Sequence, residues 1–310
     1  MKRPIFIVSF DCEGKWGMAD HLTDEYAFLT NDNLKEAYRN ITNIMDNHNI
    51  KGTFGFVGAL TMSPDEYKNS EDLFLNTKVN GKPWLERFFE DSKNRNFDGW
   101  FNPQLLEVVR SYNFHEIASH GFTHIPLKET MVSEDIFLKE MNSMKIVMER
   151  KDIEISTFIY PRNLVGYTSL LKQYGIKGFR ESFFSKDSYY VGKIKSLLSE
   201  LNVFQYSQNH SDNKSTIRIP SGYFLNWRFN LRKQIPLSIT VNRWKHAIQD
   251  AITNNRVIHL WSHPHNFING DHQYKLFEDI LKLVAEARDD KKIVIMTQKE
   301  YCENIARKIN

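Results

Sequence analysis

The sequence predicts one α/β domain spanning residues 1–310, in which seven or eight strand–helix units form a barrel. Strand and helix signals alternate along the chain, and several strand segments are continuous apolar runs, as in parallel strands covered on both faces. No repeat, low-complexity tract or linker divides the chain. With 310 residues, 41% of them hydrophobic, it can bury one large core. So many βα units favour a barrel over an open sheet.

The expected strands are short apolar or β-branched runs. The first, Pro4 to Phe10, is apolar apart from Ser9 and ends at Asp11. The others are expected at Gly52–Gly58, Glu116–Ser119, Ile155–Tyr160, Lys177–Phe179, Thr216–Pro220, Val257–Trp261 and Ile293–Met296. Because βα crossovers are right-handed, all the strands should direct their carboxyl ends to one face of the barrel.

The expected helices are amphipathic segments between these strands. Capping residues precede the first helix, in which apolar residues recur at helical spacing from Leu34 to Met45. Further helices are expected at Leu105–Tyr112, Val132–Glu149, Ser169–Tyr174, Lys193–Leu201, Arg243–Thr253, Tyr274–Ala287 and Lys299–Arg307. Two connections, at about 60–101 and 181–215, are too long for simple loops, so we interpret them as insertions over the carboxyl face of the strands.

Composition excludes several classes of partner. The net charge is only +3 and the longest basic clusters have two residues, as at Lys291 and Lys292, so nucleic acid is not expected to bind. The apolar run before Asp11 is too short for a secretory signal or a membrane span. Two cysteines at opposite ends of the chain, Cys12 and Cys302, form no disulfide framework. We therefore expect a cytoplasmic protein.

Residues that bind metals or transfer protons follow the expected strands. His120 and His124 are four residues apart and would converge on one ion if Gly121 lets the chain turn. The full set is Asp11 and Glu13 after the first strand, His120 and His124 after the third, Arg162 after the fourth, Arg180 after the fifth, and His263 and His265 after the seventh. Taken singly, these residues could be caps, surface ion pairs or loop histidines. Together on one barrel face they indicate a hydrolytic site.

Four segments resemble, in order, the motifs of the polysaccharide deacetylases, carbohydrate esterase family 4, which share a chitooligosaccharide-deacetylase homology domain. SFDCEG (9–14) resembles a first motif in which a strand ends in Thr-Phe-Asp-Asp-Gly, and HEIASHGFTH (115–124) resembles a second in which two histidines bind the metal. FIYPRN (158–163) is a looser counterpart of the third motif. HLWSHPHNF (259–267) is similar to the last, which delivers a catalytic histidine. The resemblance implies a distorted, incomplete (β/α)7-type barrel.

The first motif departs from the family pattern, because Cys12 and Glu13 follow Asp11 where the family has adjacent aspartates. Residues i and i+2 of a strand share a face, so Asp11 and Glu13 can both face the site while Cys12 faces the core. We therefore assign Asp11 as general base and Glu13 as third metal ligand beside His120 and His124, although the reverse assignment stays open. A buried thiol is favoured for Cys12 over a thiolate ligand.

The implied reaction is the hydrolysis of an N- or O-acetyl group on a sugar, with a divalent metal ion, expected to be Zn²⁺, as cofactor. His263 would protonate the leaving group, with His265 as the alternative acid. Arg162 would orient the base. Arg180, His265 and the loop residue Trp16 are expected to contact the substrate, since an indole can stack on a sugar ring.

The expected substrate is an acetylated sugar or glycan of surface-polysaccharide or glycan biosynthesis. Two other functions stay open: hydrolysis of a non-glycan amide, an activity that the same superfamily includes, and glycan binding by a module that has lost catalysis.

Overall fold

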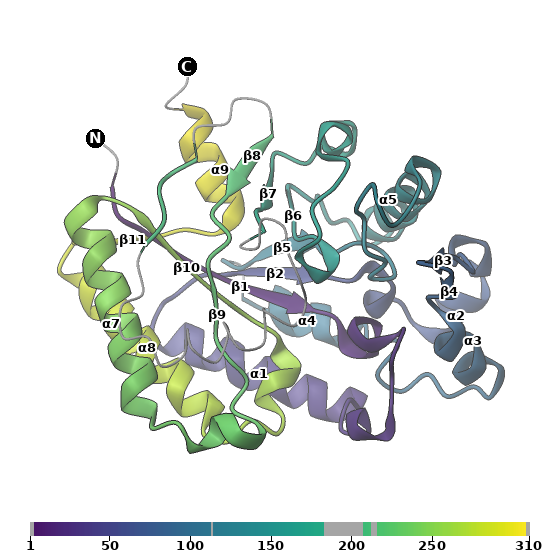
Figure 1. The fold of residues 1–310 in the computed structure, drawn as a ribbon, viewed down its shortest axis with the longest axis horizontal. Coiled ribbons are helices and arrows are strands. Elements are labelled where there is room, and N and C mark those ends of the chain that lie inside the picture. The colour runs from purple at the N-terminus through teal and green to yellow at the C-terminus, as the bar shows by residue number, and fades with distance from the viewer. Residues whose placement is uncertain (1–2, 113, 183–206, 212–215, 308–310) are drawn as a thin grey trace.

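A curved sheet of nine strands forms the centre of the protein (Figure 1). The computed structural model describes residues 3–112, 114–182, 207–211 and 216–307. The strand order is β8-β7-β6-β5-β2-β1-β10-β9, with β11 on β1, and each strand pair in this sheet is parallel. The strands are β1 (Ile5–Cys12), β2 (Thr53–Phe56), β5 (Glu116–Ser119), β6 (Thr157–Phe158), β7 (Gly178–Arg180), β8 (Ile217–Ile219), β9 (Tyr223–Phe224), β10 (Val257–Ser262) and β11 (Val294–Ile295).

The sheet curls into an incomplete barrel, which confirms the predicted fold. β8 and β9 lie at opposite ends of the strand order, although only Pro220, Ser221 and Gly222 separate them in the chain. β8 pairs with β7 and β9 pairs with β10, so a single kinked segment spans from one edge of the sheet to the other. The carbonyl of Pro220 accepts a hydrogen bond from His259 Nδ1 at 2.7 Å, and Gly222 donates its N–H to Gln208 Oε1 at 2.7 Å. These contacts anchor the kink against the barrel interior.

Apolar side chains and the last helix fill the amino-terminal end of the barrel. A buried cluster joins inward-facing residues of β1, β8 and β10 to residues of α9: Ile5, Ile7, Ile217, Ile219, Val257, Tyr301, Cys302 and Ile305. The buried carboxylate of Glu116 on β5 accepts hydrogen bonds from Thr53 Oγ1 and from the backbone N–H of Lys299, both at 2.8 Å. This end of the barrel is therefore closed, and the functional side chains collect at the other end.

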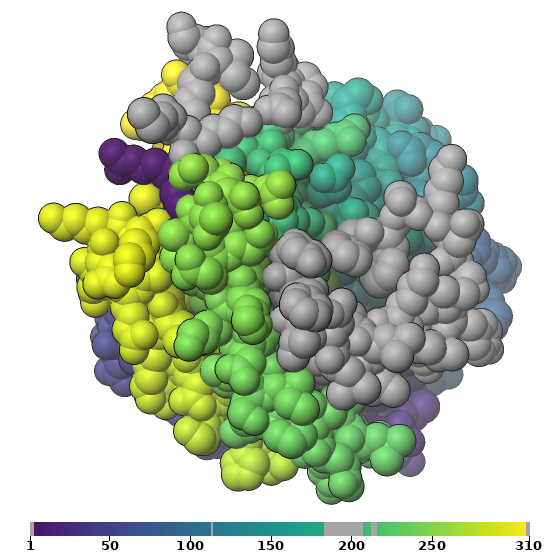
Figure 2. All heavy atoms as spheres, turned by 60° about the vertical axis from the view of Figure 1, so that its left-hand side comes forward, coloured from purple at the N-terminus to yellow at the C-terminus, as the bar shows by residue number. Residues whose placement is uncertain are grey.

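Helices cover the outside of the barrel (Figure 1). They include α1 (Asn31–Asn47), α4 (Gln104–Arg110), α5 (Glu134–Glu149), α7 (Leu237–Asn254) and α8 (Gln273–Asp289), while α9 (Gln298–Arg307) lies at the amino-terminal end. Thr30 caps α1 by accepting the N–H of Asn33 at 3.2 Å, as the capping signal predicted. None of the helices in the described ranges is both long enough and apolar enough to span a membrane. Figure 2 shows the green and yellow segments of the chain side by side on one face.

Some elements differ from the sequence prediction. The segment Thr168–Tyr174 forms a 3₁₀ helix between left-handed residues at Tyr167 and Gly175, α7 begins six residues before the predicted Arg243, and β9 was not predicted. The first insertion contains α2 (Pro64–Lys68), α3 (Glu86–Lys93) and the hairpin β3 (Lys78–Val79) and β4 (Lys82–Pro83), which lie beyond the carboxyl end of β1 (Figure 1). Most of the second insertion, including the helix predicted at Lys193–Leu201, lies outside the described residues.

The kink at Gly222 provides a test of the barrel closure. Gly222 has φ +71°, and a Cβ there would lie 2.5 Å from the carbonyl oxygen of His259. Gly175 has a similar φ of +77°, but a Cβ added to it would have no other atom within 4 Å. Both Gly→Ala variants should lose about 1 kcal/mol of stability from left-handed strain, and Gly222→Ala a further ~1–3 kcal/mol from overpacking. Chemical denaturation measures both, and equal losses would contradict the tight closure.

Candidate active site

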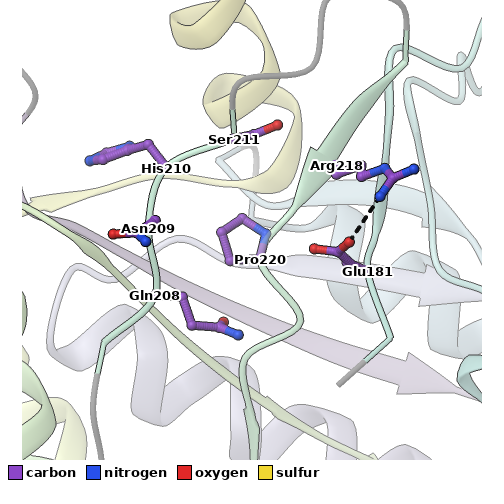
Figure 3. A pocket seen from close by; sticks show the side chains of 7 residues that line it. All are labelled: Glu181, Gln208, Asn209, His210, Ser211, Arg218 and Pro220. Atoms are coloured by element: carbon purple, nitrogen blue, oxygen red, sulfur yellow. Dashed lines mark hydrogen bonds and ion pairs between the residues drawn. The ribbon is translucent and has the colours of Figure 1, made fainter. Parts of the chain in front are cut away.

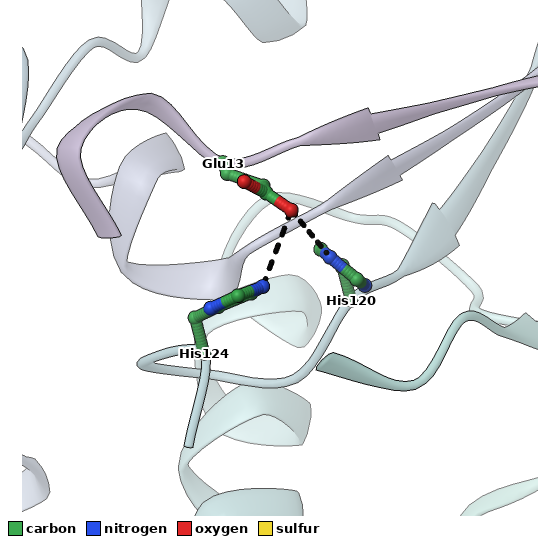
Figure 4. Close-up of side chains that lie close together, drawn as sticks. All are labelled: Glu13, His120 and His124. Atoms are coloured by element: carbon green, nitrogen blue, oxygen red, sulfur yellow. Dashed lines mark hydrogen bonds and ion pairs between the residues drawn. The ribbon is translucent and has the colours of Figure 1, made fainter. Parts of the chain in front are cut away.

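A buried cluster of one carboxylate and three imidazoles lies at the carboxyl ends of the strands. Glu13 Oε1, just after β1, lies 3.2 Å from the Nε2 atoms of both His120 and His124, which follow β5 (Figure 4). His263, after β10, approaches the same oxygen with its Nε2 at 3.4 Å. The sequence-predicted ligands are thus adjacent in space, although their metal-binding role stays a prediction.

The donor atoms of this cluster fit a divalent cation. His120 Nδ1 lies 2.8 Å from the carbonyl oxygen of Ile159 and donates a hydrogen bond to it. In the neutral tautomer that makes this bond, the lone pair of Nε2 faces the Glu13 carboxylate. Two acceptors at this distance repel each other unless a cation or proton lies between them. Burial lowers the pKa of His124 to about 4, so this ring is neutral, and neither of its buried nitrogens has a hydrogen-bond partner. Two imidazole nitrogens and a carboxylate oxygen are a common zinc ligand set.

The position of the Glu13 carboxylate depends on the alternation of side chains along β1 and on a glycine nearby. Cys12 is buried in the core, where burial raises the pKa of its thiol, so it is the buried thiol that the sequence favoured. Glu13 faces the cluster, where burial would raise the pKa of its carboxyl but the imidazoles of His263, His124 and His120 hold it well below the usual value. A Cβ on Gly17 would lie 1.9 Å from Glu13 Oε2, so only glycine at residue 17 leaves room for this carboxylate.

Asp11 forms a buried two-pronged ion pair with Arg180. The guanidinium of Arg180 donates to the two carboxylate oxygens at 2.7 and 2.6 Å, to Asn163 Oδ1 at 2.7 Å, and lies 4.4 Å from the ring centre of Trp261. Burial would raise the pKa of Asp11, but Arg180, with His120, lowers it below the ordinary value. Arg180 is 1% exposed. The structure places it against Asp11, and the expectation that it contacts substrate stays a prediction.

A polar layer below this ion pair connects it to the barrel wall. Ser9 Oγ lies 2.8 Å from His259 Nε2 and 3.4 Å from a guanidinium nitrogen of Arg180. Burial and the adjacent guanidinium lower the pKa of His259 to about 3, so the imidazole is neutral beside the cation. These contacts fix Arg180 from below.

Arg162 makes its contacts away from Asp11, the predicted base, which corrects the expectation that it orients this residue. Its guanidinium donates to the Gly17 carbonyl at 3.0 Å and to Asp20 Oδ1 at 2.6 Å, and lies 5.2 Å from the ring centre of Trp84. The backbone of Arg162 is left-handed, with φ +57°, so its position after the fourth strand does not direct its side chain toward Asp11. Arg180, one strand along the sheet, makes the expected contact.

His263 is the most exposed side chain of the cluster. Its side chain is 21% exposed, against 1–7% for the side chains of Glu13, Asp11, His120 and His124. Burial would lower its pKa, but the carboxylates of Glu13 and Asp11 raise it above the ordinary value of 6.5. The Asn266 amide nitrogen lies 3.4 Å from His263 Nδ1. A protonated imidazole at the solvent side of the cluster is suited to act as an acid.

His265 stacks behind His263 at a ring-centre distance of 4.9 Å, and the edge of Trp227 contacts its other side. It is 4% exposed, and burial lowers its pKa to about 3. A neutral imidazole with so low a pKa is a poor acid at neutral pH, so the geometry favours His263. Substrate contact by His265 stays a prediction.

Trp16 does not contact solvent, and the prediction that it contacts substrate is wrong. Its indole is 0% exposed and donates from Nε1 to the Trp100 carbonyl oxygen at 2.6 Å. It packs in an aromatic cluster with Phe74, Phe88, Trp100 and Phe101. The partly exposed indoles near the site are Trp227 and Trp261, which contact His265 and His263.

A separate cavity of about 440 Å³ lies against the outer face of β8 (Figure 3). It is lined by Glu181, Gln208, Asn209, His210, Ser211, Arg218 and Pro220, and Arg218 pairs with Glu181 at 3.4 Å. Ile217 and Ile219 face the barrel interior, so Arg218 between them faces outward. None of the seven lining residues belongs to the carboxylate–imidazole cluster.

The fold and the cluster define a barrel hydrolase class, and comparison identifies the family. Residues 20–178, just over half of the chain, match the polysaccharide deacetylase family. The chain therefore belongs to this family. The matched range contains His120 and His124 but not Asp11, Glu13, Arg180 or His263, so those four are supported by geometry alone. No curated protein matches the sequence.

One solved structure shows the same fold at low sequence identity, and two others match with lower scores. A proposed polysaccharide deacetylase of Mycobacterium smegmatis superposes with a TM-score of 0.63 at 11% identity, over 100% of this chain and 92% of that chain. A family 4 acetyl xylan esterase of Clostridium thermocellum, solved with cobalt, gives 0.43 at 10% identity over 96% and 89%. A family 4 pseudoenzyme of Bacillus anthracis gives 0.46 at 9% identity over 97% and 66%. At 11% identity, the Mycobacterium smegmatis structure shows the fold alone.

Sequence reasoning missed two asparagines of the site. Asn163 supports Arg180, and Asn266 lies beside His263. Both lie within the strand-end motifs FIYPRN and HLWSHPHNF, so an amide next to a predicted site residue was the available signal.

The ion pair of Asp11 predicts a pH-dependent stability difference. Arg180→Met leaves a buried carboxylate without its cation and should cost about 3–5 kcal/mol at neutral pH. The control Arg162→Met breaks a partly exposed pair and should cost under about 1 kcal/mol.

The folded pKa of Asp11 is lowered, so its pair stabilises the protein above the ordinary carboxyl pKa of 3.8, and this contribution disappears as the pH falls through the lower folded value. The difference between wild type and Arg180→Met should therefore shrink in acid. Urea unfolding at several pH values measures it. A small, pH-independent loss would show that the pair does not form.

Proposed function

We propose that this protein is a metal-dependent deacetylase that hydrolyses the acetyl group of an N- or O-acetylated sugar. Family membership supports a polysaccharide deacetylase, and the observation that carries the proposal is the convergence of Glu13, His120 and His124. Their ligand atoms lie within 4.8 Å of one another in a buried site at the strand ends. The location in the cytoplasm and the biosynthetic pathway expected from the sequence stay predictions.

Glu13, His120 and His124 would hold the ion, and the geometry favours Glu13 over Asp11 as the carboxylate ligand. Glu13 Oε1 is 3.2 Å from both histidines, whereas the closest approach of Asp11 to His120 is 4.0 Å and its two oxygens are already bound by Arg180. A divalent ion in this site would act as a Lewis acid toward the acetyl carbonyl and would supply an activated water. Zinc is the expected ion, because the ligands are two imidazoles and a carboxylate.

Asp11 and His263 would divide the proton transfers. Arg180 holds the Asp11 carboxylate ionised, so Asp11 can accept a proton from the attacking water while the guanidinium fixes its orientation. His263 is the more exposed neighbour of Glu13, and two carboxylates raise its pKa, which favours the protonated form. It would give this proton to the departing amine or alcohol.

Metal content tests the ligand assignment. Wild-type protein dialysed against Zn²⁺ and then against buffer should retain about one ion per chain. His120→Ala removes a ligand and should retain far less. The control His115→Ala alters the same sequence segment but at the start of β5, away from the cluster, and should retain as much zinc as wild type. Elemental analysis measures all three, and full zinc content in His120→Ala would refute the assignment.

Acetate release tests the reaction. On a panel of N- and O-acetylated sugars, Asp11→Asn and His263→Ala should each lower the rate by about 10²–10⁴-fold, because each removes a proton-transfer group. The control Asp20→Asn alters the partly exposed pairs of Asp20 with Arg162 and His21 and should retain the wild-type rate. If acetate were released only from non-sugar amides, the substrate would be an amide and not an acetylated sugar. Zinc binding with no release from either panel would indicate a binding module.

A further inference from the structure

The short segment between the two histidines determines where His124 lies. Gly121 and His124 both have left-handed backbones, with φ of +78° and +61°, and the segment has no helix or strand of its own. Among the described residues, the contact nearest to a hydrogen bond at the ring nitrogens of His124 is the 3.2 Å approach of Nε2 to Glu13 Oε1. The orientation of this imidazole therefore depends on the backbone that carries it.

Two elements hold this backbone from opposite sides. The 3₁₀ segment Gly58–Thr61 donates two N–H groups to the carbonyl oxygens of the segment, from Gly58 to Gly121 and from Ala59 to Phe122, both at 2.9 Å. These bonds fix the carbonyl side. The N–H groups of the same segment point away from them and need an acceptor.

That acceptor is the carboxylate of Glu140 on α5. It accepts the N–H of Thr123 at 2.9 Å, the N–H of Phe122 at 3.3 Å and the hydroxyl of Thr123 at 2.6 Å. Glu140 is 1% exposed, and among the described residues it forms no ion pair with a lysine, arginine or histidine. A buried carboxylate used only as an acceptor for three donors of one turn is an unusual choice for packing alone, because burial disfavours its charge.

We propose that Glu140 is a positioning residue for the metal site, which fixes His124 through Thr123 and thereby sets the affinity for the ion. The inference rests on the proposed function, since it assigns His124 as a ligand. A carboxylate suits this task because both oxygens accept. A glutamine in its place has only one accepting oxygen and no charge, so the three donors can no longer all donate to it: the two N–H groups lose their charged acceptor, and the Thr123 hydroxyl must turn to accept from the NH₂ group.

The test is the affinity for Zn²⁺, measured by competition with a chromogenic chelator, together with the visible spectrum of the Co²⁺ protein. Glu140→Gln should weaken Zn²⁺ binding about 10–100-fold, as expected for loss of a group that orients a ligand, and should change the Co²⁺ spectrum. Thr123→Val should also weaken Zn²⁺ binding, whereas Thr123→Ser, which keeps the hydroxyl, should retain the wild-type affinity and spectrum. The double variant Glu140→Gln/Thr123→Val should lose little more than Glu140→Gln, because both disrupt one contact.

Glu116→Gln is the matched control for general destabilisation. Glu116 is also a buried carboxylate that accepts hydrogen bonds from a threonine hydroxyl and a backbone N–H, but at the closed end of the barrel. It should lower the melting temperature without changing the Zn²⁺ affinity or the Co²⁺ spectrum. Equal affinities and spectra in Glu140→Gln and wild type would overturn the inference and leave the proposed function standing. Absence of Zn²⁺ binding by wild type would overturn both.

Discussion

The ion pair between Asp11 and Arg180 crosses the interior of the curled sheet, and the site depends on it. Asp11 ends β1 and Arg180 ends β7, with β2, β5 and β6 between them in the strand order. Side chains on such distant strands meet only if the sheet curves toward a barrel. The pair is fully desolvated, and a buried pair of this kind is a poor source of net stability. Its geometry is therefore better explained by what it does to Asp11, which is held ionised and immobile at the edge of the cluster.

The side chains inside the barrel change from apolar to polar to charged along its length, and the polar level contacts this ion pair. Isoleucines and α9 fill the amino-terminal end. Ser9 and His259 form the next level, and the neutral imidazole of His259 lies beside the Arg180 guanidinium without adding a second positive charge. The charged groups come last, at the strand ends. Water is excluded from below, so the electrostatic interactions of the site act in a medium of low dielectric constant.

The site residues at the strand ends could be predicted from the sequence, because parallel strands direct their carboxyl ends to one face of the barrel and side chains alternate along each strand. Alternation along β1 places Asp11 and Glu13 on one side and Cys12 on the other, and the structure agrees. The rule does not extend past the strands. Arg162 lies one residue beyond Pro161 in a left-handed conformation, so the direction of its side chain could not be predicted from alternation along the strand.

Other features depend on contacts between residues that are far apart in the sequence. Aromatic residues 58 to 85 positions later bury Trp16, and the acceptor role of Glu140 requires α5 to pack against the turn before His124, which no local pattern reports.

The change in the first motif shows how the barrel could accommodate a different carboxylate arrangement. The family pattern has adjacent aspartates, whereas this chain has Asp11 and then Glu13, two residues on and one methylene longer. Two features make room for the longer side chain. The second carboxylate has moved to the position that shares a face with the first, so Cys12 returns to the core, and Gly17 leaves the space that Glu13 Oε2 occupies. Because the space exists only where residue 17 lacks a side chain, Glu13 and Gly17 form one structural unit, and the position of the Glu13 carboxylate is set as much by the turn after β1 as by the strand itself.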